Sequence, residues 1–424
     1  MNDWLHTAAD AAGIAATCIF ILLLVWYLIR YFAGAEGRQP RLLTKCPGRL
    51  HTPTTPLSKV LMWVFIAFIV SRGLLYLGGL WAAQRAGSLA SYLANPEAYW
   101  TRWDGHHYIG LIENWYVNEG DPRLHIVFFP LYPAIGRLIH LATGLSATAC
   151  AYLVSNLAFL GCGIVMFYLA EVTYGKNAGL RAMWLMNLSP LTLFCSTAYT
   201  ESVFMLTTLA AVCLARRKKF FWAVVMGALS ANSRMVGMAT AIPIFYEMLR
   251  ASGAPRLRRY AVCVLRVLPV SLGLMAYLAL NWQITGDPFR FLTYQSEHWS
   301  QNFGSLYNTL KYTMVNAFEF YDTGYRIGVW IPQTLAILMG LILFIAVMRR
   351  GHPGDMGYSL VYYYCSIAPT WLLSGPRYLT AMYTAYPLMT TLFRRRWAFV
   401  SICILFGALC VLGGAMFSVR GCIL

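Results

Sequence analysis

The sequence predicts an all-α protein that crosses a membrane several times. Of its 424 residues, 59% are hydrophobic and only 12% are charged, and the mean hydropathy is +0.56. A soluble domain carries roughly twice that charged fraction. The apolar residues also gather in long segments that are bounded by charge, Gly or Pro. These observations exclude an ordinary cytosolic enzyme, a disordered chain and a disulfide scaffold.

We expect about twelve membrane-spanning helices, within a range of about ten to fourteen. The first apolar segment is long enough to span a bilayer and is followed by basic residues, so it is interpreted as a signal anchor. Several segments between 201 and 250 are shorter than a full span of about 17–25 residues, which predicts tilted, broken or re-entrant helices there. The segments are 11–32, 59–82, 146–171, 179–197, 201–215, 220–233, 235–250, 260–283, 327–348, 357–373, 378–393 and 397–418.

Two domains follow from this pattern. Residues 1–58 are interpreted as an added first helix with a Pro-containing cytoplasmic linker, and residues 59–424 as the main membrane domain. Two long outer loops, at about 83–145 and 284–326, combine aromatic and charged residues with apolar stretches too short to span. Such loops are typical of helices that lie along a membrane interface.

The distribution of charge predicts the orientation. About 20 of the 33 Lys and Arg residues lie in loops that the positive-inside rule makes cytoplasmic, so both termini are expected outside. About ten of the sixteen acidic residues lie on the opposite side, where we expect any chemistry. The net charge of +17 therefore indicates membrane insertion, and no nucleic-acid partner is expected. The basic loops are 33–59, 172–181, 216–219, 250–259, 349–356 and 394–396.

The most informative motif is Arg-Trp-Asp-Gly-His-His-Tyr, which begins at Arg102 in the first outer loop. A carboxylate such as Asp104 at the bilayer surface can accept a proton from an attacking hydroxyl, and nearby guanidinium or imidazole groups can balance an anionic leaving group. If a helix begins at Asp104, His107 shares its face, and Glu113 lies further along at a larger angle. The adjacent pair His106 and His107 does not predict a metal site, because neighbouring histidines point apart on a helix.

The alternative for this motif is structural. Arg102 and Asp104 can form an interfacial ion pair, with the surrounding aromatic residues forming a headgroup belt.

Two charged residues interrupt apolar sequence further along the chain. Glu201 follows Tyr199, and Arg234 ends the run Ala-Asn-Ser-Arg. Ionisable groups in membrane sequence are costly and face a cavity or a partner. A structural ion pair between Glu201 and Arg234 and a contact of either with substrate are equally open.

Taken in order, the motifs resemble the GPI mannosyltransferase 2 (PIG-V-like) family of GT-C membrane glycosyltransferases. The order is Arg-Trp-Asp-Gly-His-His-Tyr, Phe-Phe-Pro-Leu-Tyr-Pro, Ser-Pro-(x)8-Tyr-Thr-Glu-Ser, Ser-Arg, Gly-Asp-Pro with Gln and Trp, and Ser-Gly-Pro-Arg-Tyr, over about residues 59–395. The resemblance implies a GT-C fold for the main domain. It also implies inverting transfer of a sugar, typically mannose, from a polyprenyl or dolichyl phosphate to an acceptor hydroxyl.

The resemblance also implies the roles of individual residues, with Asp104 as the catalytic base. The positions that match the remaining blocks are expected to bind donor or acceptor: Arg102, Trp103, His106, His107, Glu113, Phe129, Pro130, Tyr132, Tyr199, Glu201, Arg234, Asp287, Gln295, Trp299 and Arg377.

The expected partners are the polyprenyl- or dolichyl-phosphate sugar, membrane lipid, and an acceptor glycan, glycolipid or protein. No cofactor or metal site is expected, and a divalent metal is left open. This chain has Trp115-Tyr116 where relatives usually read Gly-Tyr, so the acceptor is not defined. We expect a bacterial inner membrane with the active site facing outward, with the endoplasmic reticulum and a lumenal site as the alternative.

Two other functions stay open. Charges such as Glu201 and Arg234 can line the pathway of a transporter or lipid flippase, although no two similar halves are visible in the sequence. A GT-C transferase that uses another sugar donor is the other alternative.

Overall fold

The computed structural model describes residues 3–37, 50–253 and 255–420, and these residues form helices, turns and loops without a strand. The all-α prediction is therefore confirmed for the described chain. The helices are α1 (Asp3–Ala35), α2 (Leu57–Arg85), α3 (Leu89–Ala94), α4 (Glu97–Trp100), α5 (Asp104–Asn114), α6 (Leu131–Thr143), α7 (Ala147–Tyr174), α8 (Lys176–Asn187), α9 (Glu201–Arg216), α10 (Phe220–Ser233), α11 (Ala241–Ala251), α12 (Arg256–Val267), α13 (Leu272–Thr285), α14 (Arg290–Trp299), α15 (Leu306–Glu319), α16 (Thr323–Tyr325), α17 (Ile331–Val347), α18 (Pro353–Ile367), α19 (Gly375–Thr380), α20 (Ala385–Leu392) and α21 (Arg396–Ala415), with the shorter helical turns η1 (Asp121–Val127), η2 (Thr192–Cys195), η3 (Met235–Thr240), η4 (Leu268–Ser271), η5 (Arg326–Trp330) and η6 (Met416–Arg420).

Among the described residues, six helical stretches are long and apolar enough to cross a membrane, as expected of an integral multi-pass protein. The other predicted segments form shorter or interrupted helices, so the count of about twelve spans stays a prediction. The six stretches are Trp4–Ala35, Leu57–Arg85, Ala147–Tyr174, Arg256–Thr285, Thr323–Val347 and Arg396–Val419.

The region from 201 to 251 is broken, as its short apolar segments predict. The chain turns back between α9 and α10 at Lys218, which adopts a left-handed φ of 59°. Between α10 and η3, Arg234 is extended, with φ −157° and ψ 142°. These breaks place polar backbone and charged side chains at helix ends rather than in the middle of an apolar span.

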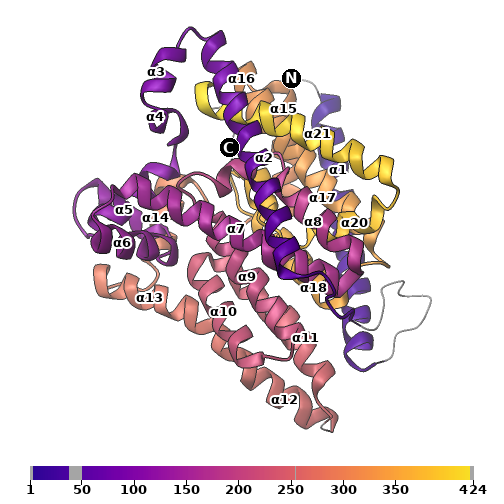
Figure 1. The fold of residues 1–424 in the computed structure, drawn as a ribbon. Helices are drawn as coiled ribbons and strands as arrows, with labels where there is room; N and C mark the ends of the chain where they lie inside the picture. The colour runs from indigo at the N-terminus through magenta and orange to yellow at the C-terminus, as the bar shows by residue number, and fades with distance from the viewer. Residues whose placement is uncertain (1–2, 38–49, 254, 421–424) are drawn as a thin grey trace.

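The two outer loops form short helices that come together. In Figure 1, α5, α6 and α14 lie at one side of the bundle, although α14 is far from the others in sequence. Tyr277 of α13 donates a hydrogen bond to the carbonyl of Ile126 in η1 at 2.7 Å. This contact ties the first outer loop to the helix that leads into the second.

Contacts between loops divide the molecule into two ends. All six basic loops are connected with one another at one end, and the outer loops and the N-terminal part of α1 meet at the other. This division agrees with the pattern of charge, and the assignment of the basic end to the cytoplasm stays a prediction. The contacts at the basic end join Glu36 to Arg256, His51 to Val172, Arg216 to both Thr173 and Asp355, and Arg181 to Arg394.

The first helix packs into the bundle. Tyr27 donates a hydrogen bond to the carbonyl of Phe344 in α17 at 3.0 Å, and Tyr31 donates one to Ile242 in α11 at 2.7 Å. The predicted domain boundary near residue 58 comes shortly after residues 38–49, which lie outside the described residues.

Helices α2 and α21 approach closely enough for their backbones to touch. A Cβ atom on Gly78 would lie 2.0 Å from the carbonyl oxygen of Val411, and one on Gly414 would lie 2.3 Å from that of Leu75. Small residues permit such close contact between membrane helices, where dispersion replaces the hydrophobic effect as the source of attraction.

We predict that Gly78→Ala lowers the free energy of unfolding by about 1–3 kcal/mol, because the new methyl group overpacks the contact. The matched control is Gly73→Ala in the same helix, where a Cβ meets nothing within 4 Å. That change should be neutral or raise stability by up to about 1 kcal/mol through helix propensity. Unfolding of both purified variants in detergent tests this, and equal effects would contradict the close contact.

Candidate functional site

Two acidic and two basic side chains meet at the end of the molecule opposite the basic loops, which is the predicted outer end. Asp104 begins α5 and Glu201 begins α9. Arg234 follows the last residue of α10, and Arg377 lies in α19. Arg377 Nη1 lies 2.9 Å from Asp104 Oδ2, and its Nε lies 3.2 Å from Glu201 Oε1. Arg234 Nη1 lies 2.7 Å from the same Glu201 oxygen, and we call these four side chains the charge network.

The charge network runs from the interior to the surface. The side chain of Glu201 is 1% exposed and that of Asp104 is 24% exposed, with Arg377 at 9% and Arg234 at 17%. A buried carboxylate needs paired charges, and Glu201 has two guanidinium partners. Asp104 is the carboxylate that solvent or a substrate can reach.

Aromatic rings surround the two guanidinium groups. Arg377 lies over the rings of Tyr199 and Phe194, at 5.2 and 5.5 Å from their centroids. Tyr378 lies under both cations, 5.0 Å from Arg377 and 4.8 Å from Arg234. Such contacts stabilise cations and hold them in place where water is scarce.

The backbone before Asp104 is held in an unusual conformation. Trp103 has a φ of 40°, in a region that bulky residues rarely adopt. The Tyr199 hydroxyl donates a hydrogen bond to the carbonyl of Arg102 at 2.8 Å, which ties this turn to the start of α9. Strain of this kind persists only where surrounding contacts enforce it. Here it directs Asp104 toward Arg377.

The ion pair expected between Arg102 and Asp104 in the structural alternative is wrong, because each residue has a different partner. Arg102 Nη2 donates to the carbonyl of Ser418 at 2.6 Å, while Asp104 pairs with Arg377. The ion pair between Glu201 and Arg234 is present, and it is part of a larger network.

The two adjacent histidines of the first motif lie in different environments. His106 is exposed, whereas His107 Nδ1 lies 3.1 Å from Nε2 of His125 and its ring stacks on Phe128 with centroids 5.2 Å apart. Trp299 of the second outer loop lies against His107, with ring centroids 6.5 Å apart.

Burial determines the protonation of this pair. Desolvation lowers the pKa of His107, although the nearby Asp104 opposes the change. Desolvation and the charge of His107 lower the pKa of His125 to about 4. At neutral pH both rings are therefore neutral and share one hydrogen bond, and His107 acts as a polar group rather than a cation.

The residues of the Phe-Phe-Pro-Leu-Tyr-Pro motif pack within the first outer loop and are not members of the charge network. Tyr132 is fully buried and its hydroxyl donates to the carbonyl of Ala151 at 2.9 Å. Phe129 stacks on Tyr277 with ring centroids 4.0 Å apart, and Pro130 precedes α6. These residues shape the loop around the network.

Three further predicted residues show no described contact with the charge network. Glu113 is exposed near the end of α5. Asp287 caps its own turn by accepting a hydrogen bond from the backbone of Phe289 at 2.9 Å, as Gly-Asp-Pro sequence often does. Gln295 lies in α14 and accepts a backbone hydrogen bond from Gln301 through its carbonyl oxygen at 3.1 Å.

Three residues at the site were not predicted. Tyr378 directly follows Arg377, and His125 lies three residues before Phe128, so both stand beside motifs that could have suggested them. Phe194 lies in an apolar run and carries no such signal.

No group of three or more His, Cys, Asp or Glu within the described residues is arranged to hold a metal ion. The scan against protein-family models and the search of curated proteins found no match to this sequence.

We predict that Glu201→Gln destabilises the protein by about 3–5 kcal/mol, because it leaves one buried and one partly buried guanidinium group facing a neutral amide. Glu113→Gln, at an exposed position in the same outer region, is the control and should stay within about 0.5 kcal/mol of wild type. Unfolding in detergent at neutral pH measures both changes. Similar losses in the two variants would show that the network does not stabilise the fold.

We predict that stability falls as pH decreases from about 6.5 to about 4, because histidine in the unfolded chain binds protons in this window and folded His125 does not. His125→Asn should reduce this loss, because it removes a histidine whose pKa burial lowers in the folded protein. Melting temperatures measured at several pH values test the prediction. An identical pH profile for wild type and His125→Asn would refute it.

Proposed function

We propose that this protein is a membrane glycosyltransferase of the GT-C type. It transfers a sugar, expected to be mannose, from a polyprenyl- or dolichyl-phosphate donor to an acceptor hydroxyl on the outer or lumenal face. The observation that carries the proposal is the pairing of Asp104 with Arg377 in a charge network whose carboxylate end is accessible. The ordered motifs that resemble the GPI mannosyltransferase 2 family support it.

Asp104 is proposed as the general base. Arg377 holds its Oδ2 oxygen at 2.9 Å, and no described residue hydrogen-bonds to Oδ1. A carboxylate held through one oxygen can present the other to an acceptor hydroxyl. Buried Glu201 fixes Arg377 from the other side, so the base is positioned by a chain of contacts from the interior.

The transfer proceeds in one displacement. The acceptor oxygen bonds to the anomeric carbon and gives its proton to Asp104, while the bond from that carbon to the phosphate oxygen breaks. The phosphate leaves with the electron pair, and attack from the opposite face inverts the anomeric centre. Arg234 and Arg377 are placed to stabilise the growing negative charge of the phosphate.

The environment suits a lipid donor. Asp104 and Glu201 begin their helices, Arg234 follows α10 and Arg377 lies in the six-residue α19. Because the protein also has six apolar stretches that can cross a membrane, we expect a lipid-phosphate head to reach these residues while its tail stays in the bilayer. The expected location is a bacterial inner membrane with the site facing outward, with the lumenal face of the endoplasmic reticulum as the alternative. The acceptor class is not specified by these contacts.

We predict that Asp104→Asn lowers sugar transfer at least about a hundredfold while the protein stays folded, because the amide cannot accept the acceptor proton. The assay supplies radiolabelled polyprenyl-phosphate mannose to membranes that contain the full chain, and it follows release of polyprenyl phosphate and movement of label.

The matched control is Asp121→Asn, which makes the same change at the exposed start of η1 in the same loop. It should keep wild-type transfer. Near-normal transfer by Asp104→Asn would remove Asp104 as the base. Movement of an intact lipid or solute across the membrane without sugar transfer by the wild-type protein would favour the transporter or flippase alternative.

A further inference from the structure

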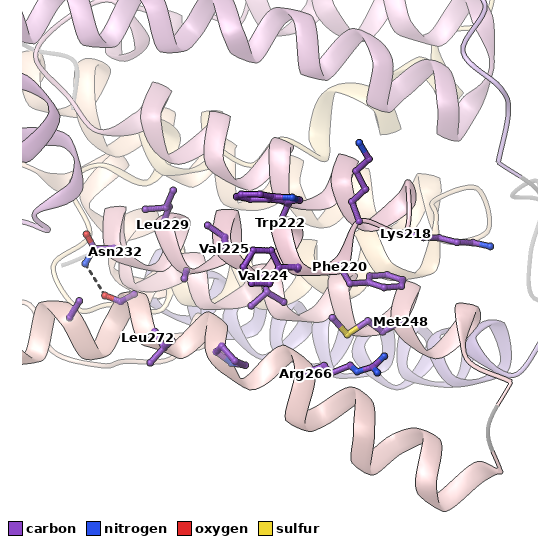
Figure 2. A pocket seen from close by; sticks show the side chains of 16 residues that line it. Lys218, Phe220, Trp222, Val224, Val225, Leu229, Asn232, Met248, Arg266 and Leu272 are labelled. Carbon is purple, nitrogen blue, oxygen red and sulfur yellow. Dashed lines mark hydrogen bonds between the residues drawn. The ribbon is translucent and has the colours of Figure 1, made fainter.

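A long apolar groove lies between α10 and the continuous helix formed by α12, η4 and α13. Its volume is about 1130 Å³, and Figure 2 shows its lining side chains along α10 and along the helix that faces it. Val224, Val225 and Leu229 of α10 face Leu272 of α13 across it. The walls are therefore hydrocarbon over most of their length.

One end of the groove is basic. Lys218 and Lys219 precede α10, and Arg266 lies near the end of α12. In Figure 2, Lys218 and Arg266 lie at the same end, far from Asn232. None of the sixteen lining residues is acidic, and in the described part of the chain none of these three cations pairs with a carboxylate. The groove thus presents unneutralised positive charge beside an apolar surface.

Arg266 is the most informative of the three cations. It lies inside Arg256–Thr285, one of the stretches long and apolar enough to span a membrane. A charge in such a position is costly unless it meets a partner or reaches the interface. Arg266 is exposed and lines the groove, so an anion bound there is within its reach.

The opposite end offers no charged group among the lining residues. The Asn232 side-chain amide donates to the carbonyl of Gly273 at 2.8 Å, and a Cβ on Gly273 would lie 1.8 Å from the carbonyl oxygen of Ala228. The helices are therefore in backbone contact there, and the one amide in the lining is already bonded. An anionic head group is recognised only at the basic end.

We propose that this groove binds an anionic glycerophospholipid of the surrounding membrane. The phosphate lies among Lys218, Lys219 and Arg266, and the acyl chains lie along the apolar walls. Basic pockets between membrane helices on the cytoplasmic side bind acidic lipid head groups, and the six basic loops predict that this is the cytoplasmic side. The 14 residues of α10 extend about 21 Å, which exceeds half of a hydrocarbon core about 30 Å thick.

This site is distinct from the charge network, and the inference does not depend on the transferase proposal. A polyprenyl phosphate is the competing occupant, because its tail would also fit apolar walls. The free cations lie at the end remote from Arg234, so the charge pattern favours a lipid whose head is on the basic side.

The experiment measures lipid binding to the purified full chain in detergent by native mass spectrometry. The probes are phosphatidylglycerol, phosphatidylcholine with the same acyl chains, glycerol 3-phosphate and polyprenyl phosphate. Wild type should bind phosphatidylglycerol in preference to the other three. Combined Lys218→Gln, Lys219→Gln and Arg266→Gln substitution should weaken that binding at least about tenfold.

The matched control neutralises Lys59, Arg395 and Arg396, three exposed cations on the same predicted side but outside the groove, and should bind as wild type does. A second variant, Val225→Phe, fills the groove and leaves its cations in place. It should weaken phosphatidylglycerol binding. Leu265→Phe, at an exposed position of α12 that does not line the groove, should not.

Each contrary result overturns the proposal. Equal loss in the two charge variants would show a diffuse effect of surface charge. Normal lipid binding by Val225→Phe would show that the acyl chains lie elsewhere, and comparable affinity for glycerol 3-phosphate would reduce the site to phosphate recognition. Preference for polyprenyl phosphate would replace the proposed occupant. None of these readouts depends on sugar transfer, so failure here and failure of the proposed function are distinguishable.

Discussion

The buried carboxylate of Glu201 is the constraint on which the outer end of this structure depends. A carboxylate that is 1% exposed is stable only with charged partners, and its two arginines come from different helices. Holding Arg234 and Arg377 together brings the ends of α9, α10 and α19 to one point. Arg377 then reaches Asp104, so the position of a surface carboxylate is set by a buried one.

Buried charged side chains are also paired at the opposite, basic end of the molecule. Arg216 pairs with Asp355 and lies 3.8 Å from Glu247, and all three side chains are buried. These contacts join α9 to α11 and α18 at the basic end. Helix α9 therefore carries a buried charged residue at each terminus, Glu201 and Arg216, with apolar packing between them. Pairing at both ends leaves the length of α9 between Glu201 and Arg216 free of charged residues, as an apolar environment requires.

Polar residues in the broken region from 201 to 251 have two separate consequences. At the outer end, the interruption at Arg234 delivers a guanidinium to the charge network. At the basic end, the turn at Lys218 leaves cations beside an apolar groove without a carboxylate partner. The cations of the first set are paired with Glu201 and Asp104, whereas those of the second set have no carboxylate partner among the described residues. This contrast in charge pairing distinguishes the proposed catalytic arrangement from the proposed lipid-binding groove.

Composition and hydrophobic pattern were sufficient to predict the helical, membrane-spanning class, the breaks after residue 201 and the separation of basic from acidic loops. Ionisable residues in apolar sequence are rare and need partners, which singled out Glu201 and Arg234. Asp104 was singled out as a carboxylate in the first outer loop, and Arg377 by the resemblance of the ordered motifs. Only the tertiary structure decided the pairing. Asp104 and Arg377 are 273 residues apart, and no local pattern predicts which of several cations meets a given carboxylate. Pairing depends on how helix ends pack in space, which long-range contacts determine.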